Sequence, residues 1–101
     1  MSKPIPHARI DETIHQRTRL AIMATLAGVD SLEFTELKGL LGLTDGNLST
    51  HAAALERAGY VQIVKTFRGK KPLTTLAITA KGRQALENYI LLLKGILDQA
   101  K

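Results

Sequence analysis

Two short helical segments separated by a tight turn constrain the fold of this chain more than any other feature of its sequence. The first covers residues 35–41, and the second opens at residue 44 and continues to residue 58. Gly42 stands in the connection and Gly59 follows the second segment, where glycine readily adopts the backbone conformation that ends a helix. This spacing predicts a helix-turn-helix unit, whose second helix can enter the major groove of DNA.

The part of the chain before this unit is expected to be mainly helical. Apolar residues recur at helical spacing from Ile10 to the helix-ending Gly28, with a break that suggests a kink at residues 15–17. Residues 32–34 favour a short extended segment. Thr35 then has the side chain expected of an N-cap for the first helix of the pair.

A β-hairpin and a final helix are expected after the unit. Residues 61–67 and 73–78 are rich in strand-forming residues, and the five residues between them, 68–72, contain Gly and Pro and predict a hairpin loop. Thr79 is expected to cap a last helix over residues 80–99. The predicted fold class is therefore mainly α (α+β): three helices, a hairpin and a C-terminal helix.

The length of the chain leaves room for one compact domain. It has 101 residues, of which 45% are hydrophobic, and a core of this size gains from further burial in a dimer. We expect a flexible arm at residues 1–8, a helix-turn-helix with its hairpin at 9–79, and a dimerisation helix at 80–101 in the same domain. The longest apolar run, residues 89–93, is too short to span a bilayer, and no signal-peptide core is present. A cytoplasmic protein without membrane contact is expected.

Several kinds of chemistry are excluded by residue content. The chain has no cysteine, which rules out disulfides, thiolate metal sites and cysteine nucleophiles. His7, His15 and His51 do not have the spacing of metal ligands, and no carboxylate pair or phosphate-binding glycine loop is found. We therefore expect no catalytic residues, no metal and no cofactor.

The positive charge of the chain is concentrated around the hairpin. The net charge is +5, with seven basic and no acidic residues in 57–86, against five basic and seven acidic residues in 1–56. Taken alone, the hairpin charges could equally be a solvated run. Beside a helix-turn-helix, a phosphate-facing patch is the better interpretation. The basic residues assigned to it are Lys65, Arg68, Lys70 and Lys71.

The second helix of the pair is predicted to have two different faces. Leu48, Ala52 and Leu55 share one face and should pack inward. The opposite face carries small and polar residues that could meet bases or phosphates. An ordinary surface helix, with its Asn and Ser serving only as caps, remains the alternative, and His51 could bond a neighbour or a phosphate. The candidate DNA-binding residues are Thr44, Asp45, Gly46, Asn47, Ser49, Thr50, His51 and Arg57.

The last helix carries more apolar residues than one packing stripe requires. Its apolar residues recur at steps of three and four residues, a spacing that is typical of a helix packed against another along a seam. Since a helix that also meets a partner needs a wider apolar face, a homodimer is expected. The alternative is that every seam residue completes the core of the monomer. The residues assigned to the interface are Leu86, Tyr89, Ile90, Leu93, Ile96 and Leu97.

Four segments in the same order resemble the MarR/ArsR-like winged-helix transcriptional regulators. Residues 48–61 (LSTHAAALERAGYV) resemble the recognition helix and first wing strand, and residues 14–23 (IHQRTRLAIM) resemble the opening helix. Residues 67–72 (FRGKKP) and 79–83 (TAKGR) are similar to the wing tip and the start of the last helix. The resemblance covers about residues 9–97.

This resemblance implies a cytoplasmic, prokaryotic homodimer that binds double-stranded DNA at an inverted repeat, with one recognition helix per subunit. The matching positions are residues 45–51 and the basic wing. Ala52 departs from the pattern, since these proteins usually carry a larger aliphatic residue there, and the cysteine-rich helix of metal-sensing members is absent. Control by an unknown small-molecule effector is left open. A winged helix that contacts only proteins is the alternative function.

Overall fold

The computed structural model describes residues 6–99, whose extents are 64 × 25 × 21 Å. Its elements run in the order expected from the sequence, with one 3-10 turn added before the first helix and the expected extended segment forming a short strand. They are η1 (His7–Arg9), α1 (Arg17–Ala27), β1 (Leu32–Glu33), α2 (Phe34–Leu41), α3 (Asp45–Arg57), β2 (Val61–Arg68), β3 (Lys71–Ile78) and α4 (Ala80–Gln99).

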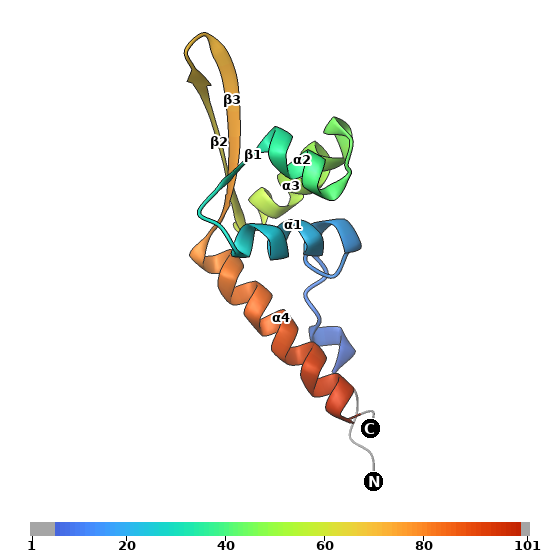
Figure 1. The fold of residues 1–101 in the computed structure, drawn as a ribbon. Helices are drawn as coiled ribbons and strands as arrows, with labels where there is room; N and C mark the ends of the chain where they lie inside the picture. Colours follow the sequence, from blue (N-terminus) through green and yellow to red (C-terminus); the bar gives the residue numbers. More distant parts are fainter. Residues whose placement is uncertain (1–5, 100–101) are drawn as a thin grey trace.

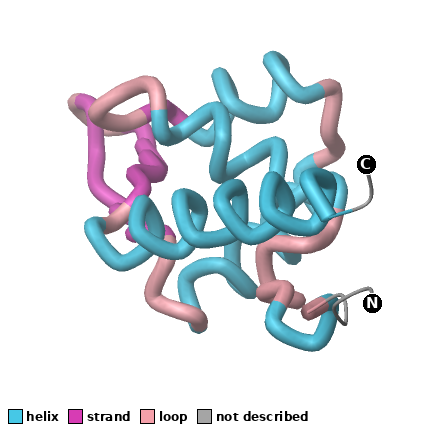
Figure 2. The backbone as a smooth tube through the Cα atoms, turned by 90° about the horizontal axis from the view of Figure 1, so that it is seen from below, coloured by secondary structure: helices cyan, strands magenta, loops and turns pink. Residues whose placement is uncertain are grey.

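The molecule has a helical body from which two elements project in different directions. Helices α1, α2 and α3 lie together, and the β2–β3 hairpin extends past α2 and α3 (Figure 1). Helix α4 starts at the base of the hairpin and runs away from it, so that its far end lies beside the N-terminal segment (Figure 1). Seen from below, the strands gather at one edge of the helices (Figure 2). The antiparallel sheet has the order β1-β3-β2.

One cluster of buried side chains joins the body, the sheet and the start of α4. The two-faced character predicted for α3 is confirmed, because Leu48, Ala52 and Leu55 are all buried. Within residues 6–99, every helix falls short of the length or the apolar character that a membrane span requires. The buried cluster comprises Ile14, Ile22, Met23, Leu26, Leu37, Leu48, Ala52, Leu55, Val61, Leu76, Leu86 and Tyr89.

The prediction of one kinked helix from Ile10 to Gly28 is wrong at its start. Helix α1 begins only at Arg17, and the side chain of Gln16 caps it by accepting a hydrogen bond from the Arg19 amide at 2.7 Å. Before it, the Asp11 carboxylate accepts from the Thr13 and Ile14 amides. This local capping by an aspartate competes with helix formation, and it buries Ile14 from a turn instead.

The N-terminal arm expected at residues 1–8 is described only in part. Residues 1–5 lie outside the described residues. His7 and Ala8 belong to the 3-10 turn, which lies beside the far end of α4 (Figure 1).

The N-cap of α2 is also different from the prediction. Thr35 lies inside the helix, and Glu33 precedes it as the cap in a reciprocal capping box with Glu36. The Glu33 amide donates to the Glu36 carboxylate at 3.1 Å. In this arrangement two backbone amides that lack a partner within the helix each donate to a side chain, whereas a threonine cap alone would serve only one of them. Phe34 is therefore helical, and the extended segment shortens to Leu32–Glu33.

The hairpin connection is tighter than the predicted five-residue loop. Arg68 pairs directly with Lys71, so only Gly69 and Lys70 form the turn, and Gly69 has a φ of 63°. Glycine at the first central position suits the short turns that match the strand twist. Pro72 is tolerated within β3 because β1 pairs only with Thr75 and Leu76, so the outer part of β3 has a single neighbour.

The predicted cap and span of the last helix are confirmed. The Thr79 hydroxyl accepts a hydrogen bond from the Gly82 amide at 2.9 Å and donates to the Gly59 carbonyl at 2.6 Å. This one side chain therefore starts α4 and ties it to the chain reversal after α3.

Candidate nucleic-acid interface

The turn between α2 and α3 fixes the start of α3. Gly42 adopts a left-handed conformation with a φ of 63°, and the Leu43 amide donates to the Lys38 carbonyl at 3.0 Å. These features end α2. Thr44 then caps α3, because its hydroxyl accepts from the Asn47 amide at 3.1 Å. The candidate residues Thr44 and Asn47 thus have a structural role in addition to any contact with a partner.

The polar side of α3 faces outward, as the sequence predicts. Its buried side is held by the core, so the opposite side has no freedom to rotate inward. His51 is half-buried at the border between the two sides, whereas Arg57 is exposed at the far end. The candidate residues exposed near the N-terminal end of the helix are Thr44, Asp45, Gly46, Asn47, Ser49 and Thr50.

Asp45 and His51, two of the candidate residues of α3, each lie next to a basic side chain. The Asp45 carboxylate lies 2.8 Å from the Lys38 ammonium, and both side chains reach solvent. An unpaired Asp45 carboxylate would repel a phosphate. The nearby Lys38 ammonium offsets its negative charge, so this end of α3 is more compatible with an anion. His51 Nδ1 lies 3.3 Å from the Arg19 guanidinium. Since arginine can only donate, Nδ1 accepts in this arrangement and the ring proton is on Nε2.

Arg19 is a residue that the sequence reasoning missed. Its guanidinium also donates to the carbonyls of Thr13 at 2.5 Å and Glu12 at 3.4 Å. It therefore links α3 to the segment before α1. The contact with His51 spans 32 positions in the sequence, and no spacing pattern could have indicated it.

The β2–β3 hairpin lies beside α3 and extends past it (Figure 1). Lys65, Lys70 and Lys71 are exposed, and none of them forms an ion pair with any residue in 6–99. Arg68 differs, because its guanidinium pairs with Glu33, the cap of α2. The structure therefore brings three of the four predicted cations to open positions and ties the fourth to β1.

A groove separates α3 from the hairpin. Ser49, Ala52 and Ala53 line it on the side of α3. Lys65 and Thr74 line the hairpin side, with Phe34 and Ile63 also contributing. Ala52 is itself buried in the core and contributes only its small side chain to the wall of the groove. One basic side chain, Lys65, and one acidic side chain, Glu56, border the groove.

A helix-turn-helix followed by a basic hairpin is the arrangement of a winged helix. A model of the winged helix DNA-binding domain family matches residues 18–97. The chain belongs to this family. An uncharacterised protein of Methanocaldococcus jannaschii is 44% identical over 72 residues, which make up 71% of this chain and 78% of that protein.

Solved structures share the fold over most of the chain. A transcriptional regulator homologue from Pyrococcus horikoshii has a TM-score of 0.83 at 30% identity and covers 90% of each chain. The regulator MosR of M. tuberculosis, solved with DNA, has a TM-score of 0.68 at 20% identity, covering 87% of this chain and 62% of that one. A MarR-family regulator from Silicibacter pomeroyi has a TM-score of 0.64 at 16% identity, covering 84% and 56%. The last two, at 20% and 16% identity, show that the winged-helix fold is shared.

Within this winged-helix domain, the residues assigned to a dimer seam divide into two groups. Leu86 and Tyr89 are buried in the core of the single chain, and Leu93 packs against that core. They therefore complete the domain itself, as the alternative interpretation held. Ile90 and Leu97 are 54% and 65% exposed and lie seven residues apart, so they share one outer stripe of α4. Ile96 lines a cleft on another side of the helix.

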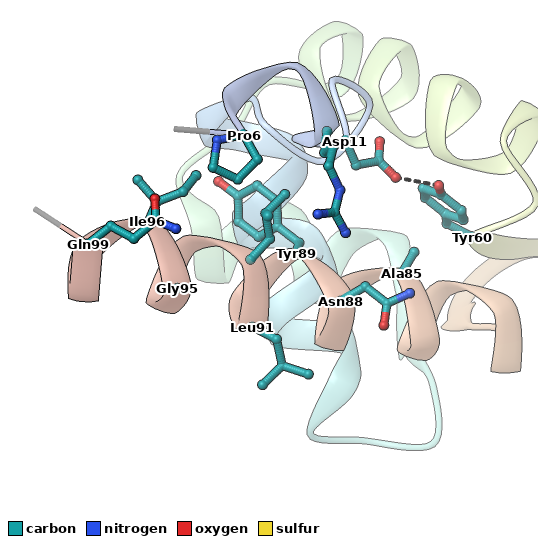
Figure 3. Close-up of a pocket in the computed structure, with 12 residues that line it drawn as sticks. Pro6, Asp11, Tyr60, Ala85, Asn88, Tyr89, Leu91, Gly95, Ile96 and Gln99 are labelled. Carbon is teal, nitrogen blue, oxygen red and sulfur yellow. Dashed lines mark hydrogen bonds between the residues drawn. The ribbon is translucent and has the colours of Figure 1, made fainter. Parts of the chain in front are cut away.

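This cleft lies between α4 and the segment before α1 (Figure 3). Arg9 and Asp11 line it from the N-terminal segment, and Asn88, Tyr89 and Ile96 line it from α4. The Tyr60 hydroxyl donates to the Asp11 carboxylate across one end of it (Figure 3). That hydrogen bond, followed by burial and the negative charge of Asp11, raises the pKa of Tyr60 to about 12. His15 Nδ1 lies 2.8 Å from the Tyr89 hydroxyl, which gives a second hydrogen bond from the segment before α1, in this case to α4.

No site for a metal is evident in the described part of the domain. Among residues 6–99, no three histidine, aspartate or glutamate side chains gather closely enough to hold a metal ion.

Proposed function

We propose that this protein is a homodimeric transcriptional regulator that places α3 in the major groove of an inverted-repeat operator, with the basic wing on the DNA backbone. The observation that carries the proposal is the outward polar side of α3, in a domain whose hairpin adjoins that helix at Ser49 and Ala53 and carries exposed cations. Helices presented in this way read base edges, whereas surrounding cations bind phosphates and position the protein.

The proposal gives separate roles to the residues of α3. Asn47 and Thr50 contact base edges, since both are exposed near the N-terminal end of the helix. The backbone amides around Gly46 face a phosphate, because the first turn of a helix has unpaired amides. His51, whose Nδ1 accepts from Arg19, presents Nε2–H as a donor to a phosphate or a base.

The wing contributes binding energy that does not depend on sequence. Lys65, Lys70 and Lys71 have no acidic partner within residues 6–99, so their charges can displace counterions from the phosphates. Arg68 remains on Glu33 or exchanges this carboxylate for a phosphate. Arg57, exposed at the far end of α3, contacts a phosphate.

The homodimer is part of the same proposal. The stripe formed by Ile90 and Leu97 supports it, because large apolar side chains are exposed on α4 after the core has been completed. A two-fold dimer would place its two recognition helices about 34 Å apart, which is one turn of the duplex. The bound site should then be an inverted repeat.

Selection of bound fragments from randomised duplex DNA tests the proposal most directly. The expected product is an inverted repeat whose half-sites are centred about ten base pairs apart. A variant with Asn47→Ala and Thr50→Ala is the matched control, which should retain DNA binding but lose the consensus. Recovery of unselected sequences with the parent protein, or no retention of DNA at all, would contradict the proposal.

The alternative, a winged helix that binds only proteins, predicts a different surface. Such a module needs an exposed apolar patch along the outer side of α3. That side instead carries Asn47, Ser49 and Thr50, which favours DNA as the partner. In the selection experiment, a protein-binding module would give no enrichment.

The proposal also includes an effector site in the cleft between α4 and the N-terminal segment. Arg9, Asp11 and Asn88 give it polar walls, and Tyr89 and Ile96 give it apolar ones. Because the Asp11 carboxylate already accepts a hydrogen bond from Tyr60, Arg9 is the charged group left to bind a small amphipathic anion. Benzoate serves as the probe, with a rise in melting temperature as the readout. Arg9→Ala should abolish this rise; equal melting of the parent protein with and without benzoate would remove this part of the proposal.

A further inference from the structure

Helix α1 directs one cationic side chain at α3, the helix proposed to read DNA. Arg19 lies in the first turn of α1 and is half-buried. Its guanidinium is 3.3 Å from Nδ1 of His51, which stands in the middle of α3. The proposed function uses His51 and assigns no role to Arg19.

The position of this guanidinium is fixed by the segment before α1. Nε of Arg19 donates to the Thr13 carbonyl at 2.5 Å, and one terminal nitrogen donates to the Glu12 carbonyl at 3.4 Å. The other terminal nitrogen is the one that meets His51. Because a guanidinium is a planar fork, placing two of its nitrogens sets the direction of the third. Arg19 therefore reaches α3 as an oriented donor and not as a mobile surface charge.

Small side chains on α3 leave room for Arg19. His51, Ala54 and Ala58 follow one another at steps of three and four residues, so they share one side of the helix. Arg19 lines a hollow together with Ala54 and Ala58. Since alanine side chains occupy little of this space, the guanidinium can lie close to α3. The contact with His51 is thus part of the packing between α1 and α3.

The guanidinium decides which nitrogen of the His51 ring carries the proton. Arginine has only N–H donors, so Nδ1 accepts and the proton of the neutral ring is on Nε2. A neutral ring without such a neighbour can hold the proton on either nitrogen. A second histidine contact in the structure shows the difference. Nδ1 of His15 meets the Tyr89 hydroxyl, which can donate or accept and therefore imposes neither form.

A ring held in this form can donate to DNA but cannot accept from it. Nε2 is the ring nitrogen farther from the backbone of α3, and His51 lies one helical turn after Asn47, which is proposed to contact a base edge. In the major groove guanine presents two acceptors, N7 and O6, whereas cytosine and adenine present exocyclic amino groups that donate. An Nε2–H group fits the acceptors of guanine and is opposed by the amino groups.

We propose that Arg19 is a positioning residue for base selection, because it holds His51 as a donor and so makes α3 select a guanine where His51 meets the duplex. Arg19 acts through His51 and does not itself touch DNA in this role. The inference rests on the proposed function. It goes beyond that function by tying one base preference to a residue outside the helix-turn-helix.

Binding profiles test the link from Arg19 to the base. The probe is a duplex with the sequence selected by the parent protein, in which each half-site position is replaced in turn by the other three base pairs. Arg19→Met removes the donors and keeps an unbranched stem. It should lower the preference for guanine at one position by about fivefold or more and leave the other positions unchanged. Arg17→Met is the matched control, since Arg17 is exposed in the same turn of α1, and it should keep every preference.

A substitution of His51 shows whether Arg19 acts through this ring. The amide of glutamine both donates and accepts, so His51→Gln should lose the same guanine preference. Arg19→Met added to His51→Gln should then cause no further change at that position, because the two residues act as one unit. His51→Gln also decides the question if Arg19→Met does not fold. An unchanged profile in His51→Gln would overturn the inference.

Nitrogen NMR of the free protein locates the proton without DNA. At about pH 8.5, where an unperturbed histidine is neutral, the His51 proton should be on Nε2 alone in the parent protein and in Arg17→Met. In Arg19→Met both forms should be populated. Thermal melting of each variant is the folding control. A proton that stays on Nε2 alone in folded Arg19→Met would overturn the role of Arg19 before any DNA measurement.

The outcomes distinguish this inference from the proposed function. If Arg19→Met binds every sequence more weakly by the same factor and keeps the guanine preference, Arg19 has only a structural or phosphate-binding role. The inference is then overturned while DNA binding stands. If the parent protein selects no sequence, the proposed function fails, and base selection through His51 fails with it.

Discussion

Gly82 lies against the Tyr60 carbonyl so closely that a Cβ atom added at Gly82 would be 2.1 Å from that oxygen. The same carbonyl accepts a hydrogen bond from the Thr79 amide at 3.0 Å. The first turn of α4 is thereby pressed onto the base of the hairpin. Because backbone forms both sides of this contact, no side-chain rotation can make room for a larger residue.

Gly82→Ala should therefore destabilise the domain by about 2 kcal/mol or more, since overpacking against backbone forces a shift of the chain. Gly95→Ala is the matched control on the same helix, because nothing lies within 4 Å of a Cβ added there. That control should be neutral or stabilising by up to about 1 kcal/mol. Urea unfolding of both variants checks the contrast, and equal stabilities would show that α4 is not docked as described.

The hydrogen bond between Tyr60 and Asp11 should make stability depend on alkaline pH. The pKa of Tyr60 is raised from 10.0 to about 12, so the folded state retains the phenol proton over a range in which the unfolded state loses it. The contribution of Tyr60 is complete below the unfolded pKa of about 10, and it disappears as pH rises through the folded value of about 12.

Comparison with Tyr60→Phe isolates this effect. The difference in unfolding free energy between parent and variant should be constant from about pH 8 to about pH 9.5 and should shrink as pH rises above about 10, as measured by urea unfolding at each pH. Lysine titration affects both proteins alike and cancels in the difference. A difference that stays constant above about pH 10 would mean that the phenol proton is not held by Asp11.

Substitutions on α3 and on the wing should change DNA binding in different ways. Asn47→Ala should alter which base is preferred in the half-site, with a penalty of about 1–3 kcal/mol on the best sequence. Lys71→Ala should weaken binding to every sequence equally. Competition binding against a panel of single-base variants measures both effects. Identical preference profiles for the parent protein and Asn47→Ala would remove Asn47 from the base-reading surface.

Charge placed on the outer stripe of α4 should break the proposed dimer. Leu97→Asp removes an apolar side chain that is 65% exposed and would bury an unpaired carboxylate between two copies. Sedimentation should show a monomer at micromolar concentration for this variant only. Gln84→Asp adds the same charge at another exposed position of α4 and should leave association unchanged. A parent protein that is itself monomeric would refute the dimer.

The recognition helix and the hairpin were predictable because their signals are local. Leu48, Ala52 and Leu55 recur at helical spacing, and Gly42 and Gly59 mark the ends of the two helices with the positive φ values that glycine tolerates. The outward polar side of α3 follows from this periodicity alone. The start of α4 was equally clear, because Thr79 caps it.

The errors arose where distant or reciprocal contacts decide the local structure. The Asp11 carboxylate ends the expected first helix by capping a turn, and Glu33 caps α2 only because Glu36 returns the bond. Tyr89 was assigned to a partner because its spacing matches a seam, yet the turn before α1 covers it and His15 bonds its hydroxyl. Periodicity identifies an apolar face but does not say which segment will cover it.

Only the base of the β2–β3 hairpin is paired with a third strand, and this affects how the length of the hairpin can change. Strand β1 pairs only with Thr75 and Leu76, so from Thr66 to Leu73 each strand has just the other as a neighbour, and two-stranded ribbons are weakly stable by themselves. Adding or deleting two residues in each strand there would lengthen or shorten the reach of the tip by about 7 Å while keeping every side chain on its own face. The span between wing and recognition helix can therefore be retuned by small insertions that leave the helical body untouched.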